Sequence, residues 1–300
     1  MKYKFLFGCS LVFLTGVFHS LASDASRQTL SFDADWKFFK GDTDNAAQID
    51  FNDASWRSLN VPHDWSIEGS VDEKNPTGGA GAYLPSGIGW YRKHFSMPAA
   101  SSSRRIFVEF DGVMANSEVW INGTHLGKRP YGYVSFRYEL TGYLNFDDGK
   151  SNILSVRTDT SAEPASRWYT GAGIYRHVRL VIMDPVHLEP WSTFVSTPKV
   201  TVDQAVVHVQ STVVNQSEAS RKVVLRTSVT GPDGKLVQRV DTPIQSVEAG
   251  KTIAFQQDVS VKSPKLWDLE KPVLYQTSVE VRADNIILDQ ETVPFGIRDA

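Results

Sequence analysis

Short runs of alternating apolar and polar residues, separated by turn residues, fill the chain from Phe32 onwards. Because successive side chains of a strand point to opposite faces, this period of two predicts half-buried β-strands. We find no long amphipathic helical pattern. The sequence therefore predicts an all-β protein. In the first part the expected strands are Phe32–Lys40 with Trp36 inward, Trp90–Phe95, Arg105–Phe110, Glu118–Ile121, Phe136–Leu140, Asn152–Arg157 and Val178–Ile182, and Asp53–Leu59 leads into the extended Val61-Pro62.

A boundary between two domains is expected at Asp184-Pro185, because proline removes a ladder donor and restrains the residue before it. Residues 23–185 would form one sandwich and residues 186–297 an immunoglobulin-like one, with about seven short strands. Three hundred residues are enough for two cores. The second set of strands is Val206–Gln210, Val223–Val229, Val237–Val240, Thr252–Phe255, Asp258–Val261 and Val273–Val281.

Composition excludes several classes of function. Apolar residues make up 41% of the chain and charged residues 22%, as in ordinary globular proteins. The net charge of −3 argues against a nucleic-acid surface, which needs a basic field. The seven histidines show no close metal-ligand spacing, so we expect no zinc site and no cofactor. The single cysteine, Cys9, leaves a mature chain without disulfides.

The N-terminus reads as a signal peptide covering residues 1–22. Lys2 and Lys4 precede the short apolar run Phe5–Phe18, and Ser20-Leu21-Ala22 offers small residues for cleavage. We therefore expect export to the periplasm or the extracellular space, with no transmembrane segment after cleavage. A lipoprotein anchored at Cys9 ranks second, because Phe7 is too large for that type of processing site.

The stretch Ser166–Val178 places Arg167, Trp168 and Tyr169 just before a Gly-x-Gly step. Glycines let a backbone turn tightly or approach another surface closely. A guanidinium and an indole at such a turn can hydrogen-bond to and stack on a sugar. The alternative is a loop pinned by its own aromatic rings, and the residues alone favour that alternative.

Two other features have structural and functional interpretations. Asn75–Gly89 is a long glycine-rich loop, and such loops are usually functional or mobile. The sequence His63-Asp64-Trp65 has the residue types of a catalytic His–Asp pair. Adjacent residues of an extended chain point in opposite directions, so we interpret Trp65 as a packing residue and Asp64 as a cap of the following turn. A type I′ hairpin turn is expected at Asn122-Gly123.

Several motifs together resemble the N-terminal, non-catalytic part of family 2 glycoside hydrolases, which include β-galactosidases, β-glucuronidases and β-mannosidases. They occur in the family's order over residues 30–300, and Val61-Pro62-His63-Asp64-Trp65 is most similar to the β-galactosidase branch. The others are Gly89-Trp90-Tyr91-Arg92, Phe110-Asp111-Gly112-Val113, Val119-Trp120-Ile121-Asn122-Gly123, Arg167-Trp168-Tyr169 with Gly171, Gly173, Ile174, Tyr175 and Arg176, and Pro264-Lys265-Leu266-Trp267 followed by Pro272-Val273-Leu274-Tyr275.

The resemblance implies a galactose-binding-like jelly-roll sandwich followed by the immunoglobulin-like one. In the family a TIM barrel comes next and supplies both catalytic glutamates. Retaining glycosidases need two carboxyl groups about 5–5.5 Å apart. Nothing here resembles the barrel's Asn-Glu signature, and residues 298–300 resemble only the start of the connection to it. We therefore expect no catalytic residue in this chain, and residues 1–300 alone to be inactive.

The resemblance also suggests three residues at the rim of a sugar pocket. Asn75 begins an Asn-Pro-Thr-Gly segment similar to one whose asparagine contacts sugar in some β-galactosidases, although the insertion Gly79–Ile88 separates it from Trp90. Arg167 and Trp168 are the other two. No acidic residue matches the one that helps some relatives to hold a monovalent cation, so no metal is expected.

Two functions remain open at this stage. The first is the N-terminal portion of an exported glycosidase, of β-galactosidase type or else a β-glucuronidase or β-mannosidase, with a carbohydrate substrate and a barrel further along the chain. The second is a stand-alone, non-catalytic carbohydrate-binding or scaffold protein. The sequence leaves the oligomeric state open, a homo-oligomer included.

Overall fold

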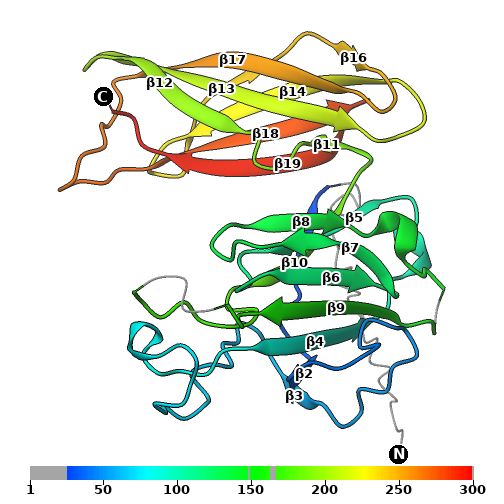
Figure 1. The fold of residues 1–300 in the computed structure, drawn as a ribbon. Helices are drawn as coiled ribbons and strands as arrows, with labels where there is room; N and C mark the ends of the chain where they lie inside the picture. Colours follow the sequence, from blue (N-terminus) through cyan, green and yellow to red (C-terminus); the bar gives the residue numbers. More distant parts are fainter. Residues whose placement is uncertain (1–25, 148, 163–166, 299–300) are drawn as a thin grey trace, which may run out of the picture.

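The computed structural model describes residues 26–147, 149–162 and 167–298. The expected signal peptide, Ser166 and the last two residues lie outside this part of the chain. The described residues form nineteen strands and three short 3-10 turns, arranged as two sandwiches one above the other (Figure 1). The all-β prediction is confirmed. Within the described ranges no helix is long and apolar enough to cross a membrane.

The first sandwich packs a six-stranded sheet against a four-stranded one, with the strand orders β3-β2-β4-β9-β6-β7 and β1-β10-β5-β8. The 3-10 turns η1 (Gly79–Gly81), η2 (Ala99–Ser101) and η3 (Thr141–Tyr143) lie in its loops. The strands are β1 (Gln28–Ser31), β2 (Trp36–Lys40), β3 (Arg57–Leu59), β4 (Ile88–Phe95), β5 (Arg105–Phe110), β6 (Ser117–Ile121), β7 (Thr124–Arg129), β8 (Phe136–Glu139), β9 (Asn152–Asp159) and β10 (Val178–Met183).

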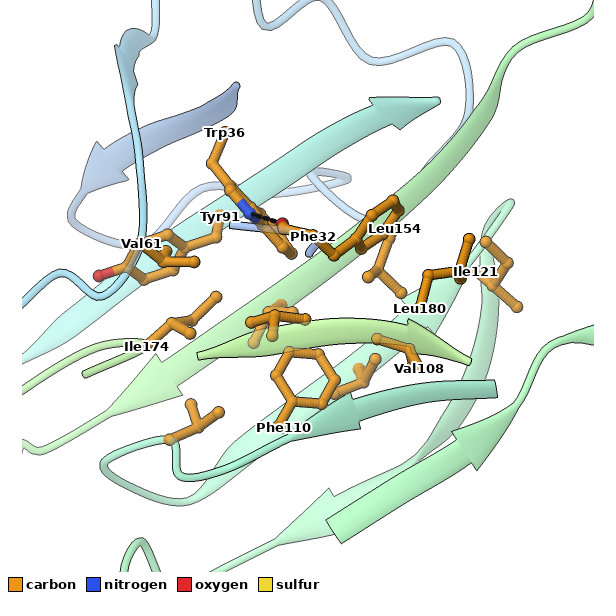
Figure 2. Close-up of a cluster of buried hydrophobic side chains, with 14 of the residues drawn as sticks. Phe32, Trp36, Val61, Tyr91, Val108, Phe110, Ile121, Leu154, Ile174 and Leu180 are labelled. Carbon is orange, nitrogen blue, oxygen red and sulfur yellow. Dashed lines mark hydrogen bonds between the residues drawn. The ribbon is translucent and has the colours of Figure 1, made fainter. Parts of the chain in front are cut away.

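The core of the first sandwich lies between these two sheets (Figure 2). Trp36 is fully buried there, as the alternation predicts, and its indole nitrogen donates a hydrogen bond to the carbonyl of Phe32 at 2.9 Å. Tyr91 from the six-stranded sheet and Phe110 from the four-stranded sheet are also fully buried. Large aromatic side chains therefore carry much of the burial that stabilises this domain.

The second sandwich has β14 and β13 at its centre. β14 pairs with β15, β16 and β18, and β18 pairs in turn with β19, while β13 pairs with β11, β12 and β17. Its strands are β11 (Val186–Leu188), β12 (Phe194–Val200), β13 (Gln204–Asn215), β14 (Arg221–Thr230), β15 (Leu236–Asp241), β16 (Gln245–Val247), β17 (Thr252–Lys262), β18 (Tyr275–Ala283) and β19 (Ile286–Phe295).

Some expected strand boundaries are wrong. The separate strands Thr252–Phe255 and Asp258–Val261 are one continuous strand, β17. Gln257 interrupts the apolar pattern, but its amide bonds to Thr227, Leu225 and Val240 within the sandwich. The opening strand starts only at Trp36, because Asp35 has φ +57° and turns the chain. The expected hairpin turn is confirmed, with φ +48° at Asn122 and +81° at Gly123.

The two sandwiches are joined through Asp184-Pro185, which leads directly from β10 into β11. Arg27 donates two hydrogen bonds to the carboxylate of Asp289 in the second sandwich, at 2.8 and 3.0 Å. Asp289 is fully buried and also accepts the amide of Leu188 at 2.8 Å. A buried carboxylate needs such partners, so this pairing fixes the N-terminal segment to the second domain.

An apolar contact accompanies this ion pair. Phe107 and Met183 lie on the outward face of the four-stranded sheet, yet they are buried. The ring of His187, at the start of the second sandwich, lies 6.0 Å from that of Phe107. His187 is fully buried, its Nδ1 donates to the carbonyl of Asp184 at 2.7 Å, and its Nε2 has no hydrogen-bond partner among the residues described.

The burial of His187 predicts that the junction is sensitive to acid. Burial lowers the pKa of His187 from 6.5 to about 4, because a proton on Nε2 would have no acceptor. The contribution of the neutral His187 to the free energy of unfolding is therefore complete above pH 6.5 and is lost as the pH falls towards 4. Linkage gives a loss of about 2–3 kcal/mol between pH 7 and pH 4.5.

The matched variant is His187→Asn, whose amide keeps a donor but does not titrate. Urea unfolding at pH 7 and at pH 4.5 should show a smaller loss of unfolding free energy for this variant than for the wild type. Equal losses in the two proteins would contradict the assignment.

Candidate functional site

Three loops meet at one end of the first sandwich, at the left of that domain in Figure 1. They are the segment 66–87 before β4, the β7–β8 connection 130–135 and the segment 167–173 before β10. Thr77 and Gly81 of the first loop line one pocket together with Trp168 and Tyr169 of the third. The Trp168 indole donates to the hydroxyl of Tyr133 in the second loop at 3.4 Å.

The third loop is held by backbone pairing with the segment that precedes the first loop. The amide of His63 donates to the carbonyl of Ile174 at 2.7 Å, and that of Trp65 donates to Ala172 at 3.1 Å. Asp64 accepts the Ala172 amide at 2.9 Å and the Ser66 amide at 3.1 Å. The structural interpretation of His63-Asp64-Trp65 is therefore confirmed: Trp65 is buried and Asp64 caps the following turn.

The Gly-x-Gly step makes this close pairing possible. Gly173 has φ +112°, and a Cβ there would lie 2.1 Å from the hydroxyl of Tyr91 and 2.8 Å from the carbonyl of His63. Gly171 has φ +82°, with a carboxylate oxygen of Asp64 3.1 Å from the position of a Cβ. Both the turn and the close approach that the sequence suggested are present.

Behind the loop lies a neutral hydrogen-bonded group. Nδ1 of His63 is 2.8 Å from the hydroxyl of Tyr91, and Nε2 is 2.8 Å from Nη2 of Arg57. Burial lowers the pKa of His63 and raises that of Tyr91 well above its usual value. Nε2 of His63 also lies 3.2 Å from Oε1 of Glu68, so a donor, Arg57, and an acceptor, Glu68, both face this nitrogen. This arrangement orients the loop rather than offering a free acid or base.

Asn75 lies in the first loop but its side chain turns into that loop. Its Nδ2 donates to the carbonyls of Ser70 at 3.0 Å and Tyr83 at 2.7 Å. Thr77, two residues on, bonds to the carbonyl of Leu84 at 2.6 Å and lines the pocket beside Trp168. The structure thus brings the two predicted segments together, while the Asn75 amide stabilises the loop.

Arg167 and Trp168 are both exposed. Trp168 is 60% exposed, and Arg167 has no hydrogen bond or ion pair with the residues that the structure describes. Two further rings are exposed, Tyr131 at 62% and Tyr133 at 42%, and their centroids lie 5.5 Å apart. Tyr133 is the one that accepts the hydrogen bond from Trp168. Our sequence analysis missed these tyrosines, although Pro130-Tyr131-Gly132-Tyr133 between two strands is a detectable signal.

The site offers guanidinium, indole and phenol groups, which suit the binding of a polar ligand with apolar faces. Across residues 26–147, 149–162 and 167–298, no three His, Cys, Asp or Glu side chains gather as a metal site. The fold and the loops therefore define the class of β-sandwich domains that bind sugars and similar ligands.

Comparison with known families identifies the class more closely. The model described as "Glycosyl hydrolases family 2, sugar binding domain" matches residues 30–184, and that described as "Glycosyl hydrolases family 2" matches residues 186–298. The chain belongs to family 2 of the glycosyl hydrolases and corresponds to the N-terminal part of its relatives. The resemblance that the motifs suggested is confirmed.

Relatives match this chain almost throughout, but the chain spans only about a third of their length. It is 42% identical to the β-galactosidase BoGH2A of Bacteroides ovatus, over 99% of this chain and 36% of that protein. It is 37% identical to a putative β-glucuronidase of Formosa agariphila, over 97% of this chain and 27% of that protein. A family 2 crystal structure from Bacteroides cellulosilyticus superposes with TM-score 0.85 and 36% identity, over 90% of this chain and 35% of that one.

The contact at Gly173 leads to a stability prediction. Gly173→Ala should lower the unfolding free energy by about 2–4 kcal/mol, because the methyl group would overlap Tyr91 and the backbone would be strained. Gly234→Ala is the matched control: φ is +78° and nothing lies within 4 Å of a Cβ. It should lose only about 1 kcal/mol. Urea unfolding measures both, and equal losses would show that crowding at Gly173 is unimportant.

Proposed function

We propose that the whole protein is an exported glycosidase of the β-galactosidase type. It hydrolyses terminal β-linked sugars with retention, through two barrel carboxyl groups that lie outside this chain. The observation that carries the proposal is the 42% identity to a β-galactosidase over 99% of this chain. The charged and apolar pattern of residues 1–22 supports export to the periplasm or beyond the cell.

In this proposal the described loops bind and orient the sugar at the rim of the catalytic pocket. The unpaired guanidinium of Arg167 donates to sugar hydroxyls, and the exposed face of Trp168 stacks on the pyranose ring. The side-chain amide of Asn75 donates to the carbonyls of Ser70 and Tyr83, so only its Oδ1 is left to bind the ligand. Orientation of this kind raises the rate of a reaction that other groups carry out.

A β-glucuronidase is the second candidate, because a putative β-glucuronidase is 37% identical over 97% of this chain. Hydrolysis of p-nitrophenyl β-galactoside and p-nitrophenyl β-glucuronide by the full-length protein separates the two. A higher kcat/KM for the galactoside supports our proposal, and a higher value for the glucuronide would replace it.

Residues 23–300 alone should not hydrolyse either substrate. Rim loops position a sugar but cannot protonate the leaving oxygen or form a glycosyl intermediate. The measurement compares purified residues 23–300 with the product of the same reading frame extended downstream. Turnover by the shorter protein above a mock preparation would show that the reacting groups lie here, and a stop codon directly after residue 300 would favour a non-catalytic binding protein.

Substitution at the rim should weaken catalysis in the full-length protein. Arg167→Ala and Trp168→Ala should each lower kcat/KM on p-nitrophenyl β-galactoside. The loss of transition-state stabilisation should be about 1–3 kcal/mol, the contribution of one hydrogen bond or stacked ring. Trp191→Ala is the control, because Trp191 is equally exposed, at 64%, but belongs to the second sandwich. Unchanged kinetics in both rim variants would mean that the loop is only structural.

A further inference from the structure

A second hollow lies on the first sandwich, next to the candidate site but with a different lining. It is a groove of about 350 Å³ lined in part by β2 and β3; Figure 1 shows these two strands at the lower end of the first sandwich. Phe39, Trp56, Trp65 and Gly69 are among the residues that line it. Ser66, in the same turn as Gly69, lines the pocket beside Trp168 instead. The turn therefore separates the groove from the candidate site.

One wall of the groove is an aromatic surface supported from beneath. The rings of Phe39 and Trp56 stack at 5.5 Å with an angle of 22° between their planes. Trp56 is only 7% exposed, whereas Phe39 is 37% exposed. The buried indole thus holds the phenyl ring in place with part of its surface facing solvent. Such a rigid ring suits packing against the C–H face of a pyranose.

The groove has more positive than negative side chains: Lys40 and Arg57 against Glu68. Lys40 is exposed, its ammonium lies 5.1 Å from the centre of the Trp65 ring, and it has no hydrogen bond or ion pair with any described residue. Arg57 and Glu68 pair at 2.8 Å, with side chains 51% and 42% exposed. The Arg57–Glu68 pair is neutral as a whole, so Lys40 gives the groove a net positive charge.

Neighbouring titratable groups do not cancel this charge. Burial, which would raise the pKa of Glu68, is outweighed by hydrogen bonds from Arg57 and His63 that lower it, so Glu68 stays ionised. Burial lowers the pKa of His63, which is neutral at pH 7. Arg57 uses only Nη2 for His63 and Glu68, so its other nitrogens still have donors for a ligand.

We propose that this groove binds a sugar unit that carries an anionic substituent, within a longer carbohydrate chain. Phe39 packs against the pyranose ring, Lys40 pairs with the carboxylate or sulfate, and Arg57 and Glu68 bond to hydroxyl groups. The volume falls at the lower end of small-molecule sites, as expected for a short stretch of chain. The groove would hold an acidic polysaccharide on the protein.

Affinity electrophoresis of the full-length protein tests this site without turnover, so its result does not depend on the proposed activity. Gels contain polygalacturonate for carboxylates, carrageenan for sulfates, or neutral galactan. The wild type should be retarded by at least one acidic polymer. Lys40→Gln should weaken that retardation about fivefold, the effect of losing one partly screened ion pair. Phe39→Ala should weaken it to a similar degree.

The matched control is Lys37→Gln, which removes the same charge from the same strand. Lys37 bonds to Ser58 at 3.0 Å and does not line the groove. Its retardation should match the wild type. The proposal is overturned if no acidic polymer retards the wild type, if Lys37→Gln and Lys40→Gln weaken retardation equally, or if neutral galactan retards all of these proteins alike.

Discussion

The candidate site depends on one crossing of the backbone, where Gly173 passes over Tyr91 and the carbonyl of His63. No side chain fits at that point, since a Cβ would lie 2.1 Å from the Tyr91 hydroxyl. The crossing lets Asp64 accept the Ala172 amide and sets the direction in which the preceding loop leaves the sandwich. This backbone pairing places Arg167 and Trp168, and the hydrogen bond from the Trp168 indole to Tyr133 adds a side-chain contact for Trp168.

The strands that were predicted well are those with one buried face. Arg105–Phe110 matches β5 residue for residue. Ile106, Val108 and Phe110 face the core, and the residues between them point to the other face of the sheet. β7 was missed because Thr124–Arg129 is an edge strand that is mostly polar on both faces. β17 was divided in two because a local pattern does not show that Gln257 finds hydrogen-bond partners on other strands.

The site was predicted only in part, for a related reason. The residues around 167–173 form a compact motif, so Arg167 and Trp168 could be named from the sequence. Tyr131 is separated from Trp168 in the sequence by the whole of β8 and β9, and only the arrangement of the strands in the two sheets brings their loops to the same end. Nor does the sequence show that Asn75 bonds to the carbonyl of Tyr83, since that depends on how the loop folds back on itself.

The burial of groups around the loop fits the binding role that we propose for this chain better than a role in proton transfer. Nε2 of His63 faces both Arg57 and Glu68, and burial raises the pKa of the Tyr91 hydroxyl well above its usual value. A general acid or base must exchange a proton near neutral pH. These two groups stay neutral and hold the backbone, while the groups that face solvent at the loop are a guanidinium and an indole. In the proposed function both groups bind and orient a sugar.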